Sequence, residues 1–189
     1  MVIETDRLVL REYVRDDWKD VHSYASDVQV VRYVDFGPNT EQDTKNFVHA
    51  VITTQNQEPR SVYEFAMTLK ATGLVIGGGG LGIGGRGQAS LGYCLHPEFW
   101  GQGFATEAAT ALCEFGFSEL QLHRIFATCR PENVAPARVM EKLGMKWEGL
   151  LREHVYVRGQ WRDSYLYSIL HHEYGIGSKE GRHHGATQQ

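Results

Sequence analysis

The chain has 189 residues and a formal net charge of -4, a size that fits one domain whose core needs no disulfide or metal support. Lysines and arginines are scattered among acidic residues, so no basic patch points to a nucleic-acid partner. Because no apolar run approaches the ~18 residues that span a bilayer, we expect a soluble, cytoplasmic protein without a membrane partner.

The cysteines and histidines form no metal-binding motif. Cys94, Cys113 and Cys129 are odd in number and far apart, and we interpret them as buried thiols of a reducing compartment. The histidine pairs at 171–172 and 183–184 have no second pair at metal-ligand spacing. We therefore predict that the protein binds no metal.

The first half of the chain predicts strands and two helices. Polar and apolar residues alternate over 7–14, as in a half-buried strand. Acidic residues at 16 and 17 begin a first helix, and a second begins near Thr40 with Val48 and Val51 on its apolar face. The pattern of an antiparallel meander follows in three further strands, at 62–69, 74–83 and 90–95.

The second half adds two helices and three strands. Apolar residues recur at helical spacing over 103–120, which predicts a helix packed on a sheet. A strand at 124–129 precedes a short helix at 135–143, which Gly144 closes. A turn at 158–160 then joins two long strands, at 146–157 and 161–171.

This order predicts an α/β fold. We expect a single mixed, mostly antiparallel central sheet of about seven strands, flanked by about four helices. The domain covers residues 1–174. Residues 175–189 are polar and glycine-rich with nothing to bury, and we predict that they form a flexible C-terminal tail.

A glycine-rich run at 73–87 holds nine of the 21 glycines, and Gly77, Gly79 and Gly82 match the dinucleotide fingerprint G-x-G-x-x-G. That fingerprint requires a helix directly after the turn and an acidic residue about 20 positions on. Strand-like residues continue through Ile83 instead. We therefore favour a flexible or bulged hairpin over a phosphate-binding loop.

A second glycine turn leads from the strand that ends near His96 into the helix after Gly103. The first amides of a helix have no intrahelical acceptor, and the peptide dipoles leave partial positive charge there. Gly101 and Gly103 allow the backbone to approach a ligand closely, so several amides can converge on a phosphate or pyrophosphate. The alternative for this segment alone is an ordinary tight turn with capping glycines.

The same turn carries the longer pattern Trp-Gly-x-Gly-x-Ala-x-Glu-Ala over residues 100–108. Further characteristic segments stand in order around it, at 5–11, 91–93, 133, 138–144 and 161–165. Together they resemble the GNAT N-acetyltransferase superfamily, in particular its RimJ/RimL-like branch of ribosomal-protein N-terminal acetyltransferases. The resemblance covers nearly all of residues 5–172.

This resemblance implies acetyl-CoA as the acyl donor. It also implies that the sheet splays between its fourth and fifth strands, where the pantetheine arm of the cofactor enters. By the resemblance Asn133 hydrogen-bonds the cofactor; the alternative is a plain helix N-cap, and the two are compatible. Arg138 would meet the adenosine phosphates, with a solvated surface cation as the alternative. The cofactor-binding residues that the resemblance implies are Leu95, His96, Gly101, Gln102, Gly103, Phe104, Ala105, Thr106, Asn133 and Arg138.

The sequence departs from the family at its usual proton donors. Pro136 stands where relatives carry serine, and Met140 where other branches carry tyrosine. Tyr93 and Ser90 lie nearest the splay and are our candidates for catalytic side chains. The alternative for Tyr93 is an aromatic core residue with a satisfied hydroxyl. Two less favoured candidates are His154 and Glu12.

The reaction implied is direct attack of a primary amine on the thioester of acetyl-CoA. The favoured acceptor is the N-terminal α-amine of a protein or peptide. Two alternatives stay open: a small-molecule amine such as an antibiotic, amino acid or polyamine, and a non-catalytic acyl-CoA-binding module. An acidic groove would favour a cationic acceptor, but the sequence does not place the acidic residues at 16, 17, 35, 41 and 43 on it. A homodimer also stays open.

Overall fold

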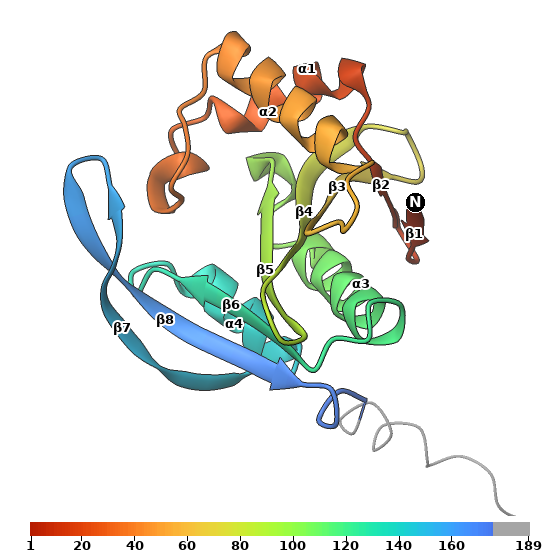
Figure 1. The fold of residues 1–189 in the computed structure, drawn as a ribbon. Helices are drawn as coiled ribbons and strands as arrows, with labels where there is room; N and C mark the ends of the chain where they lie inside the picture. Colours follow the sequence, from red (N-terminus) through yellow and green to blue (C-terminus); the bar gives the residue numbers. More distant parts are fainter. Residues whose placement is uncertain (176–189) are drawn as a thin grey trace, which may run out of the picture.

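The computed structural model describes residues 1–175, and its core is a mixed sheet of eight strands in the order β1-β2-β3-β4-β5-β6-β8-β7 (Figure 1). Apart from Gly175, the predicted tail at 175–189 lies outside the described residues. The strands are β1 (Val2–Glu4), β2 (Leu8–Glu12), β3 (Val62–Leu69), β4 (Val75–Ile83), β5 (Gln88–Leu95), β6 (Arg124–Cys129), β7 (Lys146–Val157) and β8 (Gln160–Leu170).

The predicted α/β architecture is confirmed, with one strand more than the predicted seven. The additional strand is β1, which pairs antiparallel with β2. Its three residues are too few to give a periodic pattern, so the sequence predicted only the strand that became β2. The turn between β7 and β8 lies where predicted, with Arg158 and Gly159 both at positive φ.

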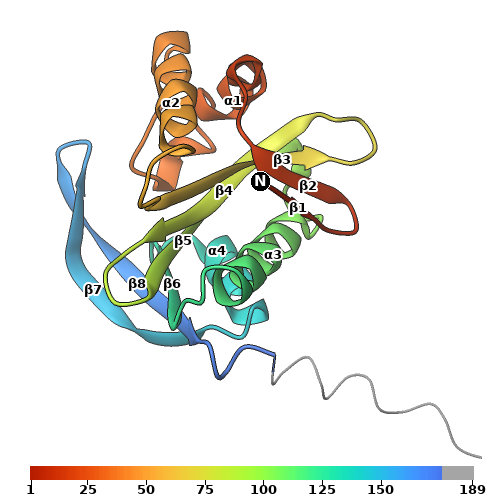
Figure 2. The same cartoon turned by 45° about the vertical axis from the view of Figure 1, so that its right-hand side comes forward.

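Four α-helices cover the two faces of the sheet: α1 (Trp18–Ala25), α2 (Glu41–Thr54), α3 (Phe104–Ser118) and α4 (Val134–Lys142). Figures 1 and 2 show α1 and α2 on one face and α3 and α4 on the other. The helix α2 begins where the sequence predicted, because Thr40 and Asp43 form a capping box.

Each face of the sheet packs a separate hydrophobic cluster. Phe65 of β3 is fully buried in the cluster with α3 and α4, whereas its neighbour Ala66 belongs to the cluster with α1 and α2. Successive side chains of a strand point to opposite faces. Odd-numbered residues of β3 therefore face α3 and α4, and even-numbered ones, including Glu64, face α1 and α2.

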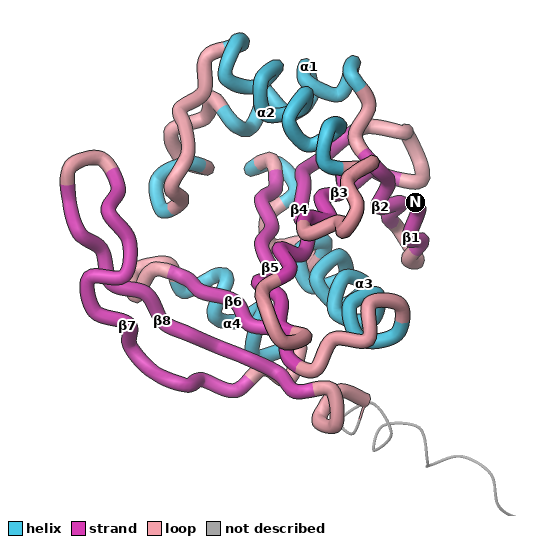
Figure 3. The backbone as a smooth tube through the Cα atoms, in the orientation of Figure 1, coloured by secondary structure: helices cyan, strands magenta, loops and turns pink. Residues whose placement is uncertain are grey.

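The sheet opens between β5 and β6, which are parallel neighbours. They pair only over Gln88–Ser90 and Arg124–Phe126, and beyond Ser90 they run apart (Figure 3). These are the fourth and fifth strands that the sequence predicted, so the expected splay is confirmed. The remainder of β6 pairs with β8 instead.

The glycine-rich run forms the interior of β4, between two hairpin turns. A Cβ at Gly77 would lie 2.3 Å from the Cys94 carbonyl oxygen, and one at Gly80 would lie 2.0 Å from the Tyr63 carbonyl oxygen. The predicted hairpin is therefore correct and its bulge falls at Ile76, where the β3–β4 register shifts. Of the two predicted forms, a flexible or a bulged hairpin, the structure has the bulged one, with Gly77 to Gly80 buried between two paired strands.

Candidate active site

The turn after β5 has the backbone of an anion-binding helix start. Gly101 and Gly103 adopt φ of 72° and 85°, the left-handed region that favours glycine. No side chain caps the first amides of α3, because Gly103 stands at the N-cap. A Cβ at Gly101 would meet nothing within 4 Å, and one at Gly103 would meet only the Arg7 guanidinium at 3.4 Å. The amides at this end of α3 are therefore accessible to a phosphate.

Arg7 and Glu107 hold this turn in place from the other end of the chain. The Glu107 carboxylate accepts hydrogen bonds from the Arg7 amide at 2.8 Å and the Arg7 Nε at 2.7 Å. Arg7 also donates to the Gln102 carbonyl oxygen at 3.0 Å and lies 4.1 Å over the Phe104 ring. Burial opposes ionisation of Glu107, but bonds from Thr5 and Arg7 outweigh it and lower its pKa. Two sequence segments that resemble the family thus form one contact network.

Other side chains of the turn brace the backbone. The Trp100 indole donates to the Leu95 carbonyl oxygen at 2.9 Å, and the Gln102 side-chain amide donates to the Glu98 carbonyl oxygen at 2.7 Å. The His96 amide is occupied by the Ile76 carbonyl at 2.8 Å. Three groups are therefore engaged in hydrogen bonds within the protein: the Leu95 carbonyl, the His96 amide and the Gln102 side chain.

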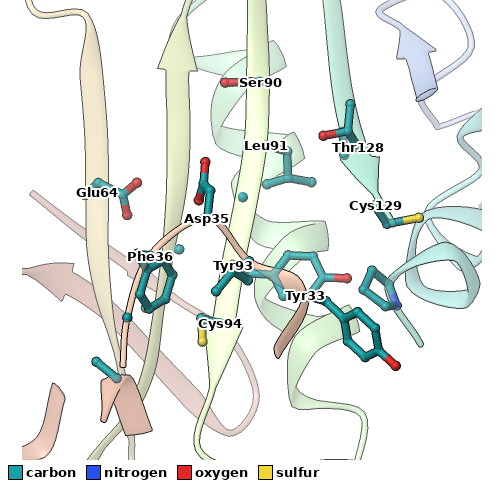
Figure 4. Close-up of a pocket in the computed structure, with 18 of the residues that line it drawn as sticks. Tyr33, Asp35, Phe36, Glu64, Ser90, Leu91, Tyr93, Cys94, Thr128 and Cys129 are labelled. Carbon is teal, nitrogen blue, oxygen red and sulfur yellow. The ribbon is translucent and has the colours of Figure 1, made fainter. Parts of the chain in front are cut away.

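A cavity of about 1190 Å³ lies at the opening between β5 and β6 (Figure 4). It is lined from the α3 and α4 face by Tyr93, Asn133 and Met140, and from the α1 and α2 face by Asp35 and Glu64. Because residues of both faces line one cavity, the opening is a passage through the sheet. A donor on one face can therefore meet an acceptor on the other.

Tyr93 extends from β5 toward β6, where Thr128 and Cys129 lie (Figure 4). Its hydroxyl is buried and has no hydrogen-bond partner among residues 1–175. The satisfied core hydroxyl considered for this tyrosine is thus not what the structure shows. Burial raises the pKa of Tyr93, so the hydroxyl stays protonated and can donate a hydrogen bond.

Ser90 lies at the fork of the opening and also lines the cavity. Its hydroxyl donates to the Gly82 carbonyl oxygen across the β4–β5 pair, at 3.4 Å. Ser90 is exposed, and it stands at the last paired position before the strands diverge. Of the two predicted catalytic side chains, Tyr93 therefore has the hydroxyl without a partner.

The start of α4 contributes a further wall of the cavity. Asn133 is at the N-cap position but its side chain makes no capping bond, so the plain N-cap alternative does not describe it. Pro136 and Met140 line the cavity where the family's usual proton donors stand. Arg138 is exposed on α4 and does not line the cavity.

Glu64 of β3 is the cavity residue that sequence reasoning missed. Burial raises the pKa of Glu64 from 4.5 to about 7. Within the described part of the chain it makes no hydrogen bond or ion pair, and its charge acts on the buried hydroxyls of Tyr13 and Tyr24. The available signal was a single charged residue within the mostly apolar strand 62–69.

Of the five acidic residues left open by the sequence, two line the cavity and three do not. Asp16 is exposed and lies outside the cavity lining. Asp35 and Asp43 line the cavity beside Glu64. Asp17 is buried and pairs with Arg11 at 2.7 Å instead. Glu41 pairs with Lys45, and Glu12 pairs with Arg60 and the amino terminus. The cavity wall on the α1 and α2 face is therefore acidic.

Arg158 ties the β7–β8 turn to the loop that carries Asp35. Its guanidinium donates to the carbonyl oxygens of Phe36 at 2.7 Å and Gly37 at 2.8 Å. It also reaches the carbonyl oxygens of Val31 at 3.1 Å and Val34 at 3.3 Å. One arginine thus fixes the loop at residues 31–37, of which 33–37 line the cavity.

The described residues include no group of three or more His, Cys, Asp or Glu side chains that could hold a metal ion. No helix within residues 1–175 is both long and apolar enough to cross a membrane.

An open sheet with an anion-binding helix start on one side and a cavity through the opening defines a CoA-dependent acyltransferase. The chain belongs to the family of GNAT acetyltransferase domains, whose model matches residues 7–146. It uses acetyl-CoA, as that family does. The glycine turn and the uncapped amides of α3 fit the pyrophosphate of this donor.

Relatives and solved structures agree with this family. The chain is 37% identical over 175 residues to the uncharacterized N-acetyltransferase YnaD of Bacillus subtilis, covering 92% of this chain and 99% of that protein. A GNAT-family acetyltransferase structure from Bacillus anthracis has a TM-score of 0.82 and 36% identity, over 92% of this chain and 100% of that one. Mycobacterium smegmatis RimJ in complex with CoA-disulfide has a TM-score of 0.75 and 25% identity, over 86% of this chain and 81% of that one.

Proposed function

We propose that the protein acetylates the N-terminal α-amine of a protein or peptide. The observation that carries the proposal is the cavity through the sheet, with Tyr93 on the donor face and Glu64 on the acceptor face. The RimJ/RimL-like segments of the sequence and the likeness to RimJ support this choice of acceptor. An acidic wall also suits an amine that arrives as a cation.

In this proposal Glu64 takes the proton of the amine. With a pKa of about 7, its carboxylate is half ionised near neutral pH, which suits a general base. An amine that arrives as a cation first loses one proton to solvent. The neutral nitrogen then bonds to the acetyl carbon and gives its surplus proton to the Glu64 carboxylate, which passes it to solvent, as the carbon–sulfur bond breaks. The sulfur leaves with the electron pair and takes a proton through the Tyr93 hydroxyl, which solvent reprotonates.

A second acceptor class is a small-molecule amine. Arg158 fixes the loop at residues 31–37, which favours a compact acceptor. Over 87 residues, 46% of this chain and 47% of that protein, the chain is 31% identical to spermidine N(1)-acetyltransferase of Escherichia coli (strain K12). A cytoplasmic location and a homodimer stay predictions.

Release of CoA thiol from acetyl-CoA with a panel of amines tests the function. The panel pairs peptides that begin with alanine or serine with spermidine, other diamines and free amino acids. We expect the highest kcat/KM for a peptide. A higher value for a small amine would move the acceptor to the second class, and CoA binding without turnover of any amine would favour the non-catalytic module.

A further inference from the structure

A polar cluster that contains one arginine lines the cavity on the side of β6 and β7. Arg130, directly after β6, and His154 of β7 both border the cavity. Ser164 of β8 is completely buried and joins them: its hydroxyl lies 2.6 Å from the Arg130 guanidinium and 3.0 Å from the His154 Nδ1. None of these residues has a part in the proton transfers proposed above.

The sheet places this cluster on the acceptor side. Ala127 and Cys129 of β6 are buried in the cluster with α3 and α4, so the alternate residues Thr128 and Arg130 face the α1 and α2 side. The pyrophosphate-binding turn belongs to α3, on the opposite side. Arg130 therefore faces the acceptor rather than the phosphates of CoA.

A bulge in β7 directs His154 to this place. The β7–β8 register shifts between Leu151 and Val155, so that three residues of β7 oppose Asp163 alone. The Glu153 amide donates to the Asp163 carboxylate at 2.8 Å, which fixes the bulge. Bulges of this kind re-aim a side chain, and here the bulge turns His154 toward Ser164 and the cavity.

Arg130 is a half-buried cation without a counter-charge in the described part of the chain. Its one engaged nitrogen donates to Ser164 Oγ and, at 3.3 Å, to the Asp163 carbonyl oxygen. No carboxylate within residues 1–175 forms an ion pair with it. The rest of its planar donor fork has no acceptor among residues 1–175, and such a fork matches a carboxylate in a bidentate manner.

The hydroxyl of Ser164 also links His154 to Arg130. It accepts from the Arg130 guanidinium and lies 3.0 Å from His154 Nδ1, so it holds the imidazole beside the guanidinium. Both side chains thus lie on one wall of the cavity, where they can contact one anionic group.

We propose that Arg130 and His154 form a subsite for a carboxylate carried by the acceptor, an inference that rests on the proposed acetylation of an amine. The amine of such an acceptor lies toward Glu64 and Asp35, and its carboxylate toward Arg130. The carboxylate comes from an acidic side chain next to a peptide N-terminus or from the α-carboxylate of a free amino acid. Both sources present the same chemistry to the guanidinium.

Matched acceptor pairs test the subsite. The first pair is the C-terminally amidated peptides Ala-Glu-Ala-Gly and Ala-Gln-Ala-Gly, and the second is alanine and alaninamide. We expect at least about a tenfold higher kcat/KM for the carboxylate member of one pair, as for a hydrogen-bonded charge. Preference in the peptide pair identifies a side-chain carboxylate, and preference in the alanine pair an α-carboxylate. Equal rates within both pairs would overturn the inference and leave the proposed acetylation intact.

Variants of the cluster complete the experiment. Arg130→Gln should remove the preference and leave the KM for acetyl-CoA unchanged. If Arg130→Gln does not fold, Arg130→Lys takes its place. It keeps the charge of Arg130 but not the planar donor fork, so it should retain part of the preference. The control is Arg162→Gln, which removes an exposed arginine of β8 that does not line the cavity. A preference that survives in Arg130→Gln, or a changed KM for acetyl-CoA, would refute the subsite.

Binding measurements separate this inference from the proposed function. If no amine is turned over, the proposed acetylation fails, but the subsite is still decided by calorimetry on protein saturated with CoA. The carboxylate member of one pair should then bind at least about tenfold more tightly than its amide, and only when Arg130 is present. Equal binding of both members would reject the subsite as well.

Discussion

Replacing Glu64 with glutamine should stabilise the protein above neutral pH and slow acetyl transfer. A folded-state pKa of about 7, against 4.5 for the ordinary carboxyl, corresponds to about 3 kcal/mol in favour of the protonated form. The unfolded chain ionises first as the pH rises. Glu64 therefore lowers the free energy of unfolding progressively from pH 4.5 to 7, and its full cost is present above pH 7.

Denaturant unfolding of wild type and Glu64→Gln at pH 5 and pH 8.5 measures this cost. The stability advantage of the variant should grow by about 2–3 kcal/mol between the two values of pH. The difference at pH 5 serves as the baseline for exchanging a largely neutral acid for an amide. Glu119→Gln, a change at an exposed residue that ends α3, should show no such growth. A constant difference between wild type and Glu64→Gln would refute the argument from burial.

The activity of the same variant links this cost to catalysis. In the wild type kcat/KM should rise with pH through about 7, because a general base acts in its ionised form. In Glu64→Gln this rise of kcat/KM with pH should be absent, and the rate should be at least about tenfold lower. An unaltered pH profile would mean that the carboxylate has no part in taking the proton.

Three further substitutions test the donor side, the proton donor and the 31–37 loop. Gly103→Val should weaken CoA binding, measured by calorimetry, at least about tenfold, because residue 103 has a φ of 85° and the valine side chain would stand where the phosphate approaches. The circular dichroism spectrum should stay unchanged. A folded variant with unchanged affinity would contradict the site. Tyr93→Phe should lower kcat about tenfold or more, because it removes the proposed proton donor. Stability should not fall, since the hydroxyl that is removed is buried without a partner in the described structure. An unchanged kcat would rule out this role of Tyr93. Arg158→Ala removes the bonds to four loop carbonyls, so it should raise the KM for the amine about tenfold and speed hydrogen exchange of residues 31–37. The KM for acetyl-CoA should stay constant. Equal changes in both KM values would argue against a local effect.

Local signals in the sequence predicted most of the architecture. Hydrophobic spacing located the helices, and the capping box of Thr40 and Asp43 explains why the start of α2 was found. The glycine turn was recognised because a positive φ and close backbone approach demand glycine at Gly101 and Gly103. Each of these signals depends on residues within a few positions of one another. The three-residue strand β1 was missed because it is too short to carry one.

The sequence by itself determined the fold class, and its resemblance to the GNAT superfamily implied the splayed pair of strands and the donor. The tertiary structure alone decided which side chains share the cavity. Glu64 obtains its raised pKa from burial, Arg7 reaches Glu107 across 100 residues, and Arg130 meets Ser164 only through the β6–β8 register. Burial and register between distant segments depend on the whole packed sheet, so no local pattern encodes them. For the same reason the acceptor side, which is built from α1, α2, the 31–37 loop and the β7–β8 hairpin, became visible only in the folded chain.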